Sequence, residues 1–107
     1  MMVRTAFPVL ALLLLGSLAY GQISPAVQRG QSFAVTNCAR CHAIDKVSPS
    51  PLPIAPPFRT LRNRYPVETL EEALAEGIVT GHPSMPEFRL DPGQIGDLIA
   101  LLKSLES

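Results

Sequence analysis

The sequence is poor in aromatic residues and in cysteine. Its 107 residues include no tryptophan, two tyrosines, four phenylalanines and two cysteines. A chain this short buries a smaller fraction of its surface than a large one does, so it has little side-chain material from which to build a core. Cys38 and Cys41 could close only one very small disulfide loop, which would constrain the unfolded chain little. These shortages indicate one small domain whose core contains something other than side chains.

The sequence also lacks an excess of charge and any strand pattern. Nine basic residues balance nine acidic ones, so no strong electrostatic field points to a nucleic-acid partner. Apolar and polar residues do not alternate with a period of two for long enough to predict a strand. No internal repeat is visible either.

An apolar segment opens the chain. Arg4 precedes a leucine-rich run, and small residues at alternate positions close it at Gly21, which is the layout of a secretory signal peptide. We expect residues 1–21 to be removed, leaving residues 22–107 as one domain on the non-cytoplasmic side. The alternative is an uncleaved anchor, but residues 6–20 at about 1.5 Å each are too short for a bilayer core about 30 Å thick.

Three helices are expected from capping residues and apolar spacing. The first, over residues 24–38, begins with a Ser-Pro pair typical of a helix N-terminus. The second, over residues 67–77, has glutamates on its solvent side, and the third, over residues 91–105, begins with Asp-Pro-Gly-Gln. Between the first two, five prolines within residues 47–58 predict an ordered wrapping loop. The expected fold class is all-α.

The two cysteines belong to a CxxCH motif at residues 38–42, Cys-Ala-Arg-Cys-His. A dithiol oxidoreductase would place its cysteine pair beside a βαβ pattern, which this sequence lacks. A zinc site could combine the motif with His82, but adjacent residues rarely converge on one tetrahedral ion. In covalent haem attachment the two thiols bond the macrocycle, and the histidine that follows ligates the iron. Export and the need for a core filler favour one haem c bonded to Cys38 and Cys41, with His42 as its proximal ligand.

A second axial ligand is available in residues 81–86, Gly-His-Pro-Ser-Met-Pro. Neighbouring prolines restrict the backbone around Met85, so its side chain has little freedom to reorient. We therefore expect Met85 to ligate the iron and His82 to be an ordinary loop histidine. Thioether ligation would raise the reduction potential relative to ligation by two histidines, whereas ligation by His82 would lower it.

The order of these motifs resembles that of the class I c-type cytochromes over the whole of residues 22–107. The resemblance implies a small domain of three to four helices around one covalent haem, with the N- and C-terminal helices crossing at close quarters. In that family a glycine of the first helix meets an aromatic residue of the last. Gly30 matches the glycine, whereas Leu101 stands where the aromatic residue is usual.

The same resemblance assigns roles to the segment that follows the haem motif. It implies that the Pro56 carbonyl accepts a hydrogen bond from the second ring nitrogen of the proximal histidine, and that Phe58 lines the haem pocket. The doubled proline leaves this register open by one residue. Of the donors that follow, we expect Arg59 or Tyr65 to bind the haem propionates, ordinary surface charge being the alternative.

Two protein ligands would leave the iron no open position for a substrate. We therefore expect no catalytic residue, and a monomeric periplasmic carrier that moves single electrons between periplasmic or membrane redox enzymes. Its protein partners would be transient, and contact with a membrane would arise only through them or through an uncleaved leader. The alternatives are a haem subunit of a larger dehydrogenase or oxidase complex, and a gas- or peroxide-binding haem protein if Met85 dissociates.

Overall fold

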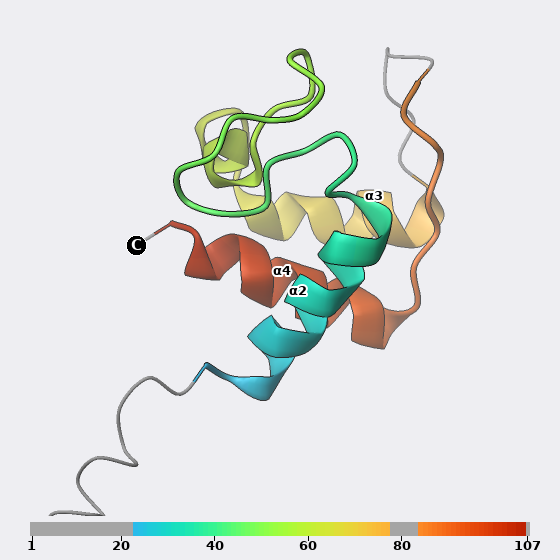
Figure 1. Ribbon diagram of the computed structural model, residues 1–107. Helices are drawn as coiled ribbons and strands as arrows, with labels where there is room; N and C mark the ends of the chain where they lie inside the picture. The colour runs from blue at the N-terminus through green and yellow to red at the C-terminus, as the bar shows by residue number, and fades with distance from the viewer. Residues whose placement is uncertain (1–22, 78–83, 107) are drawn as a thin grey trace, which may run out of the picture.

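A computed structural model describes residues 23–77 and 84–106 of the chain. In chain order the elements are α2 (Pro25–Asn37), the short 3₁₀ helices η1 (Phe58–Asn63) and η2 (Val67–Thr69), α3 (Leu70–Glu76) and α4 (Pro92–Ser104). These residues contain no strand, so the all-α class is confirmed (Figure 1). The predicted signal peptide and His82 lie outside the described residues.

Helix α2 begins where the sequence predicts. The Ser24 hydroxyl accepts a hydrogen bond from the Val27 N–H at 3.2 Å, and Pro25 occupies the first helical position. This satisfies one of the backbone donors left unpaired at a helix N-terminus. At the other end the Cys38 N–H donates to the Ala34 carbonyl at 2.8 Å. The first cysteine is therefore fixed in place as the C-cap of a regular helix.

Helix α4 begins with a reciprocal cap. The Gln94 N–H donates to Asp91 Oδ1 at 2.8 Å, and the Asp91 N–H donates to Gln94 Oε1 at 3.2 Å. This capping box pairs two backbone donors that the helix itself cannot satisfy. The helix buries one apolar face, whose members are Ile95, Leu98, Ile99, Leu101 and Leu102.

Helices α2 and α4 cross at Gly30 (Figure 1). A methyl group at Gly30 would overlap the backbone carbonyl oxygen of Asp97 and would come within 3.1 Å of Leu101 Cβ. Beside the crossing, Arg29 Nε donates to Asp97 Oδ2 at 3.0 Å. The predicted close crossing is thus confirmed, and Leu101, 2% exposed, packs where an aromatic residue is usual in the resembled family.

The second predicted helix, over residues 67–77, consists of two elements in the structure. Residues 67–69 form a 3₁₀ turn, after which α3 continues to Glu76 and stops at Gly77, whose φ of 106° favours glycine. The segment that returns towards α4 is tied to α3, because the Leu90 N–H donates to the Leu74 carbonyl at 2.9 Å. Figure 1 shows this returning segment, in orange, passing the C-terminal end of α3 on its way to α4.

The proline-rich residues 47–58 form an ordered loop, as predicted, and several hydrogen bonds hold it. The Leu52 N–H donates to the Cys41 carbonyl at 3.1 Å, and the Phe58 N–H donates to the Ala43 carbonyl at 2.9 Å. The Ala43 N–H in turn donates to Ser50 Oγ at 3.1 Å. The donors of these hydrogen bonds are Leu52, Phe58 and Ala43, so the prolines, which have no N–H, leave this set of hydrogen bonds intact.

Asp45 fastens the start of this loop. Its Oδ1 accepts from the Val47 N–H at 3.0 Å and from the Ser48 N–H at 2.7 Å, while Oδ2 accepts from the Ser48 hydroxyl at 2.6 Å. These hydrogen bonds, that of the Ser48 hydroxyl first, lower the pKa of the Asp45 carboxyl to about 2. The turn is therefore stabilised by the ionised carboxylate.

We expect the stability that Asp45 contributes to disappear in acid. Because the folded pKa is lowered to about 2 from about 3.9 in an unfolded chain, the contribution is complete above pH 4 or so. It is lost as the pH falls through the folded value. Urea unfolding of the wild type and of Asp45→Asn between pH 6 and about 2 measures it. The difference in stability between the two proteins should shrink over this window, and a constant difference would contradict the prediction.

No helix among residues 23–77 and 84–106 is both long enough and apolar enough to cross a bilayer.

Candidate functional site

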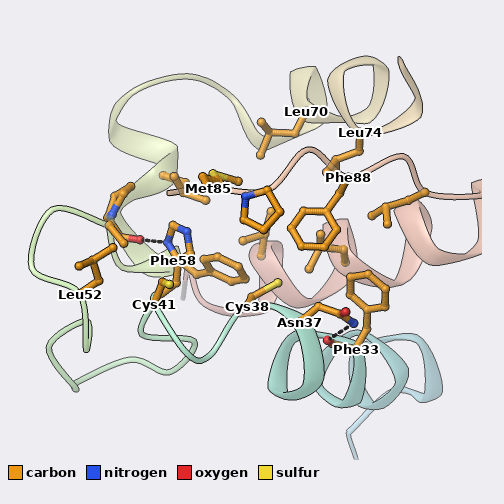
Figure 2. A pocket seen from close by; sticks show the side chains of 18 of the residues that line it. Phe33, Asn37, Cys38, Cys41, Leu52, Phe58, Leu70, Leu74, Met85 and Phe88 are labelled. Atoms are coloured by element: carbon orange, nitrogen blue, oxygen red, sulfur yellow. Dashed lines mark hydrogen bonds between the residues drawn. The ribbon is translucent and has the colours of Figure 1, made fainter. Parts of the chain in front are cut away.

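A cavity of about 420 Å³ lies between α2, the proline-rich loop, α3, the 84–90 segment and α4. Small-molecule and cofactor sites have volumes of about 300–1,000 Å³ and mostly apolar walls. The wall of this cavity is likewise largely apolar, with contributions that include Phe33, Leu52, Leu70, Leu74 and Phe88 (Figure 2). The shortage of aromatic side chains therefore corresponds to a real hollow in the core.

Both cysteines reach this cavity from one turn. Beyond the end of α2, the Cys41 N–H and the His42 N–H donate to the Cys38 carbonyl at 3.1 and 2.9 Å. The turn places the two thiols along the same wall of the cavity, and both are free (Figure 2). Burial raises the pKa of the Cys38 thiol to about 11. A dithiol redox centre needs a lowered thiol pKa instead, so this environment is unsuited to that chemistry.

His42 also lines the cavity and is held in a defined orientation. Its Nδ1 lies 2.7 Å from the Pro56 carbonyl oxygen, drawn as a dashed line in Figure 2. Since a carbonyl can only accept, Nδ1 carries the proton and Nε2 keeps a free lone pair. The hydrogen bond implied by the resemblance is present, and it fixes the register on Pro56, not Pro57. The Phe58 ring lies against the imidazole with centroids 5.2 Å apart.

Met85 contributes to the same cavity from a different part of the chain. It belongs to the segment that the Leu90–Leu74 hydrogen bond ties to α3. Figure 2 shows it on the wall opposite Cys38 and Cys41, and its side chain is half-buried. The cavity thus has two thiols on one wall and a thioether on the opposite wall, and the imidazole of His42 also contributes to its lining.

The two residues predicted to bind the haem propionates, Tyr65 and Arg59, lie in different places relative to the cavity. Tyr65 lines the cavity and is 41% exposed, as expected of a residue at its rim, and Arg64 lines the cavity as well. Arg59 is not among the lining residues. Its Nη1 donates instead to the Ser48 carbonyl at 2.7 Å within the proline-rich loop.

Several lining residues were not predicted from the sequence. Phe33 and Asn37 belong to α2, and the Asn37 amide donates to the Phe33 carbonyl at 3.0 Å. Residues four apart share a helix face, so helical spacing counted back from the cysteine motif could have identified this pair. Leu52 and Phe88 lie in irregular segments without such a period, so no comparable signal exists for them.

These features fit a haem. The apolar wall can cover a flat macrocycle, and the thiols stand within one turn of each other, as attachment at two points requires. The imidazole presents a free Nε2, the nitrogen through which it would ligate iron. Within the described ranges, by contrast, no three histidine, cysteine or acidic side chains are grouped to hold a metal ion directly.

Comparison with known families agrees with this geometry. The family model for Cytochrome c matches residues 27–106, which span α2 to α4 and the cavity that they enclose. Comparisons with curated proteins and with solved structures found no match. Cytochrome c proteins bind haem c covalently, and Cys38 and Cys41 form the CxxC arrangement for it. The chain therefore belongs to the cytochrome c family.

Proposed function

We propose that this protein is a periplasmic single-electron carrier with one haem c, bonded to Cys38 and Cys41 and ligated by His42 and Met85. A cytochrome c domain implies haem-based electron transfer. The observation that carries the finer proposal is the composition of the cavity wall: an oriented imidazole beside the two thiols, and a thioether on the opposite wall. The iron of the bound group supplies the one-electron chemistry.

Residues of the cavity wall would orient the ligand, exclude water and bind the propionates. The Pro56 carbonyl favours the tautomer of the neutral His42 ring with its proton on Nδ1, so that the lone pair of Nε2 would be directed to the iron. Met85 would hold the iron from the opposite wall of the cavity, which would keep gases and peroxide from binding to it. The apolar wall keeps water away, and exclusion of water and burial are among the factors that set a haem potential. Tyr65 and Arg64 offer donors at the cavity edge where the propionates would emerge.

The proposal extends to location and partners. An export signal in residues 1–21 would deliver the chain to the periplasm, where haem c is attached. Its partners would be redox proteins that bind transiently through small interfaces, and the carrier itself would be a monomer. Size-exclusion chromatography of the exported protein distinguishes this carrier from a subunit of a larger complex.

Spectroscopy of the exported protein tests the proposal. The protein would be purified from the periplasm of a host that matures c-type haem, and its oxidised and reduced spectra would be recorded. We expect a low-spin haem in both states, a sulfur-to-iron charge-transfer band in the oxidised state, and no spectral change when carbon monoxide is added to the reduced protein. A high-spin oxidised fraction or a shift with carbon monoxide would favour a gas- or peroxide-binding protein instead.

A further inference from the structure

The orientation of His42 depends on a short stretch of chain. Pro56 supplies the carbonyl at 2.7 Å from Nδ1, and Phe58 supplies the ring that lies against the imidazole. The backbone of Phe58 is joined to Ala43, the residue after His42, by a hydrogen bond of 2.9 Å. Any movement of residues 56–58 would therefore change the environment of the imidazole directly.

Arg59 fixes the end of that stretch. Its Nη1 donates to the Ser48 carbonyl at 2.7 Å and lies 3.4 Å from the Asp45 carbonyl, so the side chain reaches back across the base of the proline-rich loop. The residue is half-buried, and its stronger contact is a charge-assisted hydrogen bond. Arg59 thus joins the two limbs of the loop immediately after the residues that hold His42.

Asp45 prepares the other limb for this contact. Its carboxylate accepts hydrogen bonds from both the N–H and the hydroxyl of Ser48, at 2.7 and 2.6 Å. Those bonds fix the turn whose carbonyl Arg59 reaches. Asp45 and Arg59 also attract each other, which contributes to the lowered pKa of the Asp45 carboxyl. Asp45, Ser48 and Arg59 together form a clamp across the loop.

We propose that this clamp positions His42: by holding the two limbs of the loop together, Arg59 and Asp45 keep the Pro56 carbonyl against Nδ1 and so set the reduction potential. The inference rests on the proposed function, in which His42 ligates the haem iron. It assigns Arg59 a role in positioning, acting through Pro56, in place of the propionate binding that the sequence favours.

The expected direction follows from the chemistry of the imidazole. A hydrogen bond accepted from Nδ1–H makes the ring a stronger electron donor, and a stronger donor favours the oxidised iron. Loosening the clamp should therefore raise the reduction potential. It should also let the Nδ1 proton exchange with solvent more rapidly, because N–H protons in stable hydrogen bonds exchange only when the structure opens locally.

A purely electrostatic effect of the substitutions would shift the reduction potential in a different way from the loss of the clamp. Arg59→Gln removes a positive charge and by itself would lower the potential, whereas Asp45→Ala removes a negative charge and would raise it. In the double variant the net charge is unchanged, so a shift in that protein reports positioning. Arg62→Gln is the matched control, because Arg62 Nη1 also donates to a backbone carbonyl, that of Glu106 at 2.5 Å, away from His42.

The experiment compares the haem-loaded wild type with these four variants. The reduction potential would be measured by titration, and the exchange rate of the His42 Nδ1 proton by NMR of the reduced proteins. In the double variant we expect the Nδ1 proton to exchange at least tenfold faster than in the wild type. The potential should rise by an amount that corresponds to a threefold or larger increase in the equilibrium constant for reduction. The control should keep the wild-type exchange rate, and its potential should not rise, because the loss of a positive charge by itself lowers the potential.

The outcomes separate the clamp from the proposed function. A wild type that carries no covalent haem would overturn both. If the wild type carries haem and the double variant keeps the wild-type exchange rate and potential, only the clamp is overturned. The clamp is also overturned if the two single variants shift the potential in opposite directions and the shifts cancel in the double variant. Should the double variant fail to fold, the exchange rate in Arg59→Gln alone decides, because this rate does not depend on the sign of the removed charge.

Discussion

Replacement of Met85 by alanine is expected to make the reduced protein bind carbon monoxide. Met85 is the thioether on the cavity wall opposite the two thiols. Without it, the second axial position would be open to water and to gases. The oxidised protein should become high-spin and lose its sulfur-to-iron charge-transfer band. The reduction potential should fall, since a thioether favours the reduced state, and we expect a change of more than about 59 mV, or tenfold in the equilibrium constant.

Met85→His provides the control for this experiment. It restores a ligand without restoring sulfur, so it should lower the potential and lack the charge-transfer band, yet remain insensitive to carbon monoxide. Absorption spectra with and without the gas, together with a redox titration, distinguish the three proteins. If Met85→Ala keeps the band of the wild type, Met85 is not the ligand.

Replacement of Gly30 by alanine is expected to destabilise the protein although alanine is the better helix former. The added methyl group would overlap the Asp97 carbonyl oxygen and crowd Leu101 Cβ at 3.1 Å. Both neighbours are parts of α4 that cannot rotate away, so the two helices would have to separate. Overpacking of this kind costs about 1–3 kcal/mol, which outweighs the gain of about 1 kcal/mol in helix propensity.

Gly96→Ala is the matched control, because it adds the same methyl group within a helix. Nothing lies within 4 Å of that position on α4, so the substitution should stabilise the protein by about 0.5–1 kcal/mol. Chemical unfolding of the haem-loaded proteins measures both changes. We expect the two variants to differ in sign, and stabilisation by both substitutions would show that α2 and α4 do not cross as closely as described.

The helices that could be predicted are those with local start signals. Ser24 and Asp91 accept hydrogen bonds from N–H groups only three residues away, so their capping roles depend on the neighbouring sequence alone. The 3₁₀ helix Phe58–Asn63 has no such signal and was not predicted. It follows Pro57 without a side-chain cap and depends on how the proline-rich loop closes, which involves contacts distant in the sequence.

In the candidate site, too, the features that depend on neighbouring residues could be predicted and those that depend on distant contacts could not. The cysteines and His42 are close in sequence, so one turn of backbone brings them together, whichever way the rest of the chain runs. The placement of Pro56 against His42 was expected only from family resemblance. The destination of the Arg59 side chain could not be predicted, because it depends on the path of a loop with five prolines in residues 47–58. Many such paths satisfy the same dihedral restrictions.

Denaturing mass spectrometry of the exported protein tests most directly whether Cys38 and Cys41 hold a haem covalently. The protein would be purified after maturation in a c-type haem host, unfolded in acid and weighed beside a Cys38→Ser/Cys41→Ser variant. We predict that the unfolded wild type retains the mass of one haem, on a chain shortened by residues 1–21, and that the double variant retains none. An unfolded wild type that has lost all its haem would contradict covalent attachment and, with it, the proposed cytochrome function.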